Sequence, residues 1–96
     1  MANFRKRIDR KTIFFTDHAL DRWRERSGRN EIELSQRLDN GPRLVRDIPE
    51  WSDVDRFHRA RASGFIELDD NEGFVVNRNP NGDYVAVTYL DRVDQR

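Results

Sequence analysis

Three segments with the composition of β-strands make up the last third of the chain and constrain its fold more than any other feature. They cover residues 64–68, 73–78 and 83–90. Each is rich in aromatic and β-branched residues, as strands are. The turn between the second and the third contains Asn81-Gly82, which supplies the positive φ values that tight hairpin turns need. The pattern predicts an antiparallel meander.

Two helices are predicted ahead of these strands. The first covers residues 17–27, with Thr16 or Asp17 as its N-cap and a glycine directly after its last residue. The second covers residues 30–39, begins at a capping asparagine and is stopped by Asn-Gly-Pro. The helical period places three apolar residues of the first helix on one inward face: Ala19, Leu20 and Trp23.

The remaining segments carry weaker signals. Residues 1–11 are rich in Arg and Lys and are expected to form a flexible basic arm, and residues 12–15 a brief strand or extended entry. Residues 43–48 are expected to form a strand. Residues 51–62 suit either a short helix capped by Ser52 or an irregular connection.

The predicted fold is α+β, with two N-terminal helices packed on a C-terminal antiparallel sheet of three to five strands, in one domain over residues 12–96. A chain of 96 residues has room for one modest core. It has no cysteine, which excludes disulfides and thiolate metal sites. Since no apolar run approaches about 18 residues, we expect a cytoplasmic protein away from membranes. The spacing of the two histidines predicts no metal site, and no cofactor is expected.

Positive and negative charges are equal in number but unevenly distributed. Residues 1–48 carry 12 Arg or Lys and 8 Asp or Glu, whereas residues 49–96 carry 6 and 10. Much of the positive charge lies in the first eleven residues. Such a segment either contacts nucleic acid or serves as a solubilising tail, and both interpretations stay open.

His18 and Arg22 form the first candidate catalytic pair. His18 falls in the first turn of a predicted helix, where the backbone N–H groups and the helix dipole favour anions. Arg22, four residues later, lies on the same face, and Arg26, near the edge of that face, is predicted to bind substrate. An imidazole beside a fixed cation suits acid–base chemistry on a phosphodiester. A surface histidine without function explains His18 equally well.

Thr88, in the last predicted strand, is the third catalytic candidate. A hydroxyl there can bind a phosphate oxygen, although β propensity alone also explains a threonine. Strict alternation places Thr88 on the face opposite Tyr89, which we expect in the core. His58 and Arg59 form a second basic spot that is predicted to bind substrate, and nothing in the sequence brings His58 close to His18.

A known family pattern matches several of these residues. The motif His-Ala-Leu-x-Arg-x-x-Glu-Arg begins at His18, and the terminal segment is Val85-Ala86-Val87-Thr88-Tyr89-Leu90. This motif, the second helix and the terminal segment, in that order, resemble the small toxin-like domains of the barnase–EndoU–colicin–RelE ribonuclease superfold. The resemblance is to its uncharacterised bacterial and phage members in particular. The resemblance spans residues 13–92 in element order. It implies an acid–base role for His18, a phosphate clamp at Arg22 and a strand hydroxyl at Thr88.

The function that this resemblance implies is a metal-independent, toxin-like endoribonuclease. It would cleave RNA by attack of a ribose 2′-hydroxyl on the adjacent phosphate, which yields a 2′,3′-cyclic phosphate. The alternative is a non-catalytic module, of the kind a phage encodes, that binds RNA or a host protein. A small assembly protein is a third interpretation. By analogy, a cognate inhibitor is a further partner, and the sequence indicates no oligomeric state.

Overall fold

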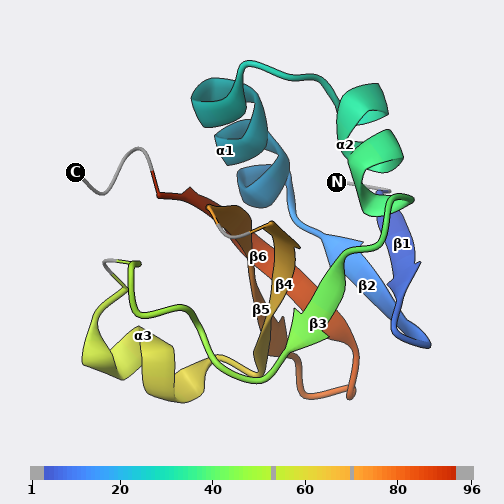
Figure 1. Cartoon of the computed structure of the whole chain (residues 1–96). Helices are drawn as coiled ribbons and strands as arrows, with labels where there is room; N and C mark the ends of the chain where they lie inside the picture. The colour runs from blue at the N-terminus through green and yellow to red at the C-terminus, as the bar shows by residue number, and fades with distance from the viewer. Residues whose placement is uncertain (1–3, 53, 70, 93–96) are drawn as a thin grey trace.

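A β-hairpin precedes the first helix, and the helices lie between strands along the chain (Figure 1). The computed structural model describes residues 4–52, 54–69 and 71–92. Its strands are β1 (Arg5–Ile8), β2 (Lys11–Phe15), β3 (Arg43–Val45), β4 (Gly64–Asp69), β5 (Glu72–Arg78) and β6 (Tyr84–Asp91). Its helices are α1 (Asp17–Ser27), α2 (Glu31–Leu38) and α3 (Arg56–Arg61).

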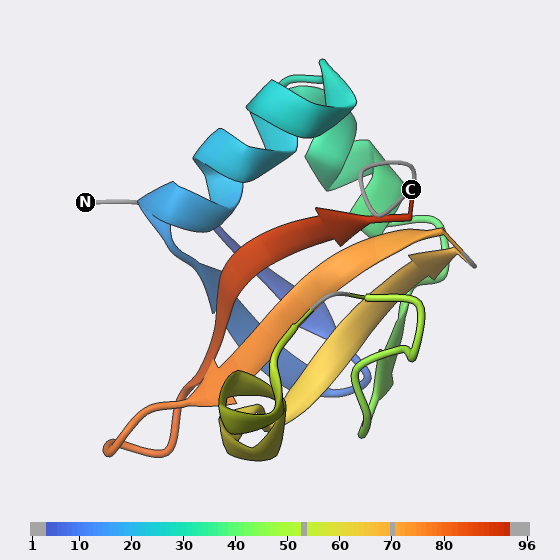
Figure 2. The same cartoon turned by 90° about the vertical axis from the view of Figure 1, so that its left-hand side faces the viewer.

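One curled sheet contains all of these strands, in the order β1-β2-β6-β5-β4-β3, and forms a half-barrel (Figure 2). The expected meander of β4, β5 and β6 is antiparallel. However, β2 pairs in parallel with β6, with Phe15 beside Ala86. The predicted arrangement of two N-terminal helices on a C-terminal antiparallel sheet is therefore wrong, because the N-terminal hairpin belongs to the sheet.

The prediction of a flexible arm over residues 1–11 is wrong for residues 5–11, which form β1, a turn and the start of β2. Residues 1–3 lie outside the described residues. The turn between β1 and β2 places Asp9 and Arg10 at positive φ values of 49° and 71°. Ile8 is buried in the core, so alternate residues of this basic segment face solvent. At the turn, the carboxylate of Asp9 accepts a hydrogen bond from the Leu44 N–H at 2.8 Å, which links the hairpin to β3 at the far edge of the sheet.

Both long helices form where their capping residues predict them. The Thr16 side chain accepts a hydrogen bond from the Ala19 N–H, and Gly28 ends α1 at a φ of 70°. Asn30 and Glu33 form a reciprocal capping box at the start of α2. Local sequence therefore determines these helix ends, whatever the tertiary fold.

The segment 51–62 forms a helix only in its second half. α3 is capped by Asp55, whose carboxylate accepts a hydrogen bond from the His58 N–H at 2.9 Å. Ser52, the predicted cap, is buried in the preceding loop instead. Likewise, β3 ends at Val45, three residues before the end of the predicted strand.

Strands β4, β5 and β6 bury apolar side chains on both of their faces. On the face under α1, Trp23 packs edge-on against Tyr89 and lies 6.2 Å from Phe74, between ring centroids. Figure 1 shows α1 and α2 together on that side and α3 away from them. The opposite face carries a smaller cluster around Phe65 and Val75, against which apolar residues of the α3 region pack. The sheet thus separates α1 from α3.

A β-bulge in β6 changes which face its side chains occupy. Val75 pairs with Thr88 whereas Val76 pairs with Ala86, so one extra residue lies between them on β6. Ala86 and Tyr89, three residues apart, consequently share the main core. Strict alternation therefore fails between Ala86 and Tyr89, whereas Thr88 lies on the face opposite Tyr89, as expected. The prediction that Tyr89 lies in the core is confirmed, since it is 1% exposed.

A partly buried carboxylate, that of Glu72, links the loop between α1 and α2 to the sheet. Glu72 accepts hydrogen bonds from the Tyr89 hydroxyl and from the Arg29 guanidinium, both at 2.6 Å. The guanidinium also lies 4.1 Å from the centroid of the Trp23 ring. Burial, with Glu72 beside it, raises the pKa of the Tyr89 phenol, so this hydroxyl keeps its proton and acts as the donor.

Gly73 in β5 has no room for a side chain. A Cβ atom there would overlap the Ile66 carbonyl oxygen and the ring of Phe65. We expect Gly73→Ala to lower the free energy of unfolding by about 3 kcal/mol, measured by urea denaturation. Gly41→Ala is the control: it meets nothing within 4 Å and carries only the cost of a φ of 79°, about 1 kcal/mol. Equal losses in the two variants would contradict this packing argument.

Candidate functional site

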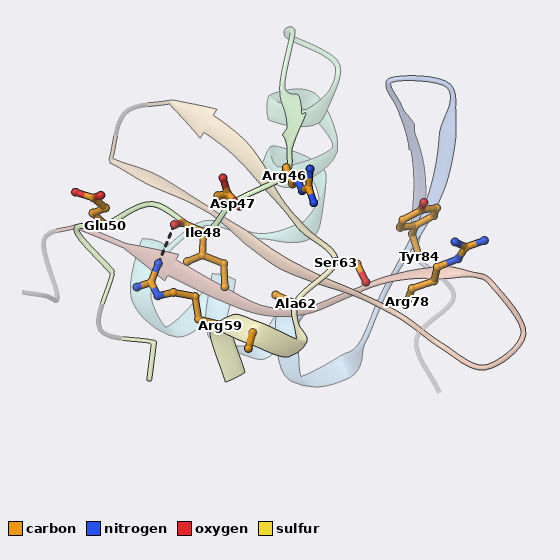
Figure 3. A pocket seen from close by; sticks show the side chains of 10 residues that line it. Arg46, Asp47, Ile48, Glu50, Arg59, Ala62, Ser63, Arg78 and Tyr84 are labelled. Carbon is orange, nitrogen blue, oxygen red and sulfur yellow. Dashed lines mark hydrogen bonds between the residues drawn. The ribbon is translucent and has the colours of Figure 1, made fainter. Parts of the chain in front are cut away.

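Two cavities flank α3. The larger, of about 880 Å³, lies at the end of the sheet away from α1 and α2 (Figure 3). The smaller is a groove of about 480 Å³ between α3 and the β5-β6 hairpin. On one side of α3, Arg59 lines the larger cavity, and so does Ala62, directly after the helix. The other side contributes Phe57, His58 and Arg61 to the groove.

An aspartate and a histidine are paired at the groove. Each carboxylate oxygen of Asp55 lies 2.9 Å from Nδ1 of His58. The hydrogen bond from the His58 backbone N–H, followed by the one from its side chain, lowers the pKa of Asp55. An ionised carboxylate only accepts hydrogen bonds, so Nδ1 of His58 carries the proton. In the neutral imidazole, Nε2 is then the basic nitrogen.

Other polar and aromatic side chains line the same groove. Thr88 and Asn77 come from the sheet, and Arg61 and Phe57 come from α3. The Arg61 guanidinium lies 5.1 Å from the centroid of the Phe57 ring, and Phe57 is 62% exposed. The groove therefore combines a base, a hydroxyl, a cation and an exposed aromatic ring. Of the residues predicted from sequence, it brings together His58 and Thr88.

His18 and Arg22 lie on α1, and neither belongs to the described lining of the two cavities. His18 is exposed in the first turn. Arg22 is half-buried, and its guanidinium lies 3.9 Å from the carboxylate of Glu25. Since α1 and α3 pack on opposite faces of the sheet, Thr88 shares the groove with His58 and not with His18. Arg26, half-buried near the end of α1, also lines neither cavity.

Arg59, predicted to bind substrate, is held by the loop before α3. Its guanidinium donates to the carbonyl oxygens of Ile48 (2.8 Å), Pro49 (3.3 Å), Ser52 (3.2 Å) and Val54 (3.4 Å). It also donates to the Ser52 hydroxyl at 3.2 Å. These contacts assign the guanidinium a structural role, because its two terminal nitrogens already have acceptors in the loop.

Sequence reasoning missed Asp55 and Arg61. The signal for Asp55 was local: an aspartate three residues before a histidine is positioned to cap a helix and to contact the histidine ring. Arg61 follows His58 by three residues and therefore lies on the same side of the helix.

The chain was also compared with known proteins, and no family model, curated protein or solved structure matches it. Over the described ranges, no group of three or more His, Cys, Asp or Glu side chains is arranged to hold a metal ion. None of the helices described above combines the length and the apolar character needed to cross a bilayer.

Replacing Arg59 tests its structural role. We expect Arg59→Met to lower the free energy of unfolding by about 2 kcal/mol, because loop carbonyls lose their charged hydrogen-bond donor. Urea denaturation measures this loss. Arg56→Met, on the exposed start of the same helix, is the matched control and should change stability by less than about 0.5 kcal/mol. A stable Arg59→Met protein that loses only affinity for RNA would instead indicate a substrate-binding arginine.

Proposed function

We propose that the chain is a metal-independent endoribonuclease and that the groove between α3 and the β5-β6 hairpin is its active site. The Asp55–His58 pair is the observation that supports this most directly. A histidine held in one tautomer by a carboxylate is suited to general base catalysis. Arg61 and Thr88 line the same groove and supply a cation and a hydroxyl for a phosphate.

In the proposed reaction, Nε2 of His58 removes the proton from a ribose 2′-hydroxyl. The 2′-oxygen forms a bond to the adjacent phosphorus, and the bond from phosphorus to the 5′-oxygen of the next nucleotide breaks. The leaving 5′-oxygen takes up a proton from the imidazolium or from water. The products are a 2′,3′-cyclic phosphate and a 5′-hydroxyl end. Asp55 stabilises the imidazolium that forms in the first step.

The other groove residues act on the phosphate and on a base. Arg61 offers a guanidinium that binds two phosphate oxygens at once, and it stabilises the charge that develops on them. The Thr88 hydroxyl donates to a non-bridging oxygen. The exposed ring of Phe57 offers a stacking surface for a neighbouring base. A single strand is favoured as substrate, because stacking on Phe57 needs an unpaired base.

Two alternatives differ from this proposal in the catalytic residues or in the activity. The family resemblance implies His18 and Arg22 as the catalytic residues, and they lie on the other side of the sheet from the groove. The second alternative is binding without cleavage, to RNA, to a host protein or to a cognate inhibitor. It is favoured by the exposed Phe57 on a helix that carries three arginines.

Removal of the proposed base gives the first test. We expect His58→Ala to lower the rate of RNA cleavage by at least about 100-fold, because general base catalysis contributes that much or more. The measurement uses purified protein, a labelled single-stranded RNA and EDTA. Gel analysis then shows the fragments and whether they end in a cyclic phosphate.

Two further variants make this test specific. Asp55→Asn keeps a capping side chain but removes the charge that stabilises the imidazolium, so cleavage should fall while α3 stays folded. His18→Ala tests the alternative catalytic set in the same assay. Loss of cleavage in His18→Ala with full activity in His58→Ala would move the active site to α1. RNA binding by the unaltered protein without any cleavage would leave only the binding function.

A further inference from the structure

We infer that the larger cavity binds a phosphodiester of the same RNA strand, so that the RNA crosses α3 between the two cavities. This inference rests on the proposed function, because that function defines the ligand. Arg78 and Tyr84 lie at one end of the cavity, and Arg46 lies between them and Asp47 (Figure 3). Arg46, Arg78 and Tyr84 come from the end of β3, the end of β5 and the start of β6, so the sheet itself holds them around one opening.

Tyr84 holds two cations beside its ring. Nζ of Lys11 lies 5.0 Å from the ring centroid, and Cζ of Arg78 lies 5.4 Å from it. Cation–π attraction keeps these like-charged side chains, from two different strands, close together. Arg78 is fixed further by a hydrogen bond from Nε to the Gly82 carbonyl oxygen at 3.3 Å. This bond uses the nitrogen nearest the stem and leaves the terminal amino groups to a ligand.

These cations have no carboxylate of their own in the part of the chain that the structure describes. None of the ion pairs there includes Lys11, Arg46 or Arg78. Two carboxylates, Asp47 and Glu50, also line the cavity. Figure 3 shows Glu50 at the end of the cavity far from Tyr84 and Arg78, and Asp47 next to Arg46. The end formed by Tyr84 and Arg78 is therefore the one that attracts an anion.

The position of α3 favours a chain of phosphates over a small anion. With its side chains, a helix is about 10–12 Å wide, so two phosphates of one strand are needed to reach both sides of α3. The groove supplies Arg61 for one phosphate, and the larger cavity supplies Arg46 and Arg78 for another. Guanidinium groups suit this role because they bind phosphate oxygens in pairs.

The test measures how salt weakens RNA binding. The probe is a fluorescent 2′-O-methyl RNA of about 12 nucleotides, which lacks the attacking hydroxyl and so cannot be cleaved. Its dissociation constant is measured between 50 and 200 mM salt for the unaltered chain and for the double variant Arg46→Gln/Arg78→Gln. Each lost phosphate contact lowers the salt slope by about 0.7. Because Arg46 and Arg78 hold one phosphate together, the double variant should lose about 0.7 and bind more weakly at every salt concentration.

Arg24→Gln is the matched control, because it removes one exposed charge from α1, outside both cavities. Its salt slope should equal that of the unaltered chain. An unchanged slope in the double variant, or an equal loss in Arg24→Gln, overturns the inference. The proposed reaction is tested separately with ordinary RNA. If that RNA stays intact while the double variant shows its reduced salt slope, the phosphate site is supported and the nuclease activity is contradicted.

Discussion

The parallel pairing of β2 with β6 is the constraint on which the rest of the structure depends. It joins an early strand to the last strand inside the sheet, so the connection between them contains all the other elements after β2: α1, α2, β3, α3, β4 and β5. The pairing continues into Thr16, whose N–H donates to the Ala86 carbonyl oxygen at 3.1 Å. The Thr16 hydroxyl then reaches the Val87 carbonyl oxygen at 3.4 Å, beside the bulge. One contact region thus joins the start of α1 to β6 beside the bulge.

The far end of α1 is held by a different kind of interaction. Just beyond the helix, Arg29 lies over the Trp23 ring and donates to Glu72, which also accepts from Tyr89. Removing a carboxylate even partly from water is costly unless hydrogen bonds satisfy it, and here two donors do so. Because α1 is anchored to the sheet at both ends, its exposed face carries His18 and Arg22 away from the groove. The rigid placement of α1 is therefore the reason that the two histidines lie apart.

Sequence predicted the elements whose signals are local and missed those whose partners are distant. The caps at Thr16 and Asn30 and the turn at Asn81-Gly82 act within a few residues, and α1, α2 and the β5-β6 hairpin form as expected. The pairing of Phe15 with Ala86 joins residues about seventy positions apart, and no local pattern encodes it. For the same reason, sequence identified Thr88 and His58 separately but not their shared groove. Alternation with Tyr89 predicts the face on which Thr88 lies, but only the fold places α3 and His58 over that face.

The short helix α3 owes its stability to contacts outside itself, since six residues do not form a stable helix in water. Arg59 anchors it to the preceding loop, and Asp55 caps its first turn. Those structural roles leave His58 and Arg61 available for a ligand. Asp55 has a structural role and a role at the groove, because its carboxylate caps α3 and also orients the His58 imidazole. Its folded-state pKa is lowered, so this contribution is present above its ordinary pKa and is lost as the pH falls through the lowered value. The helix start and the tautomer of His58 are thus coupled through a single charge.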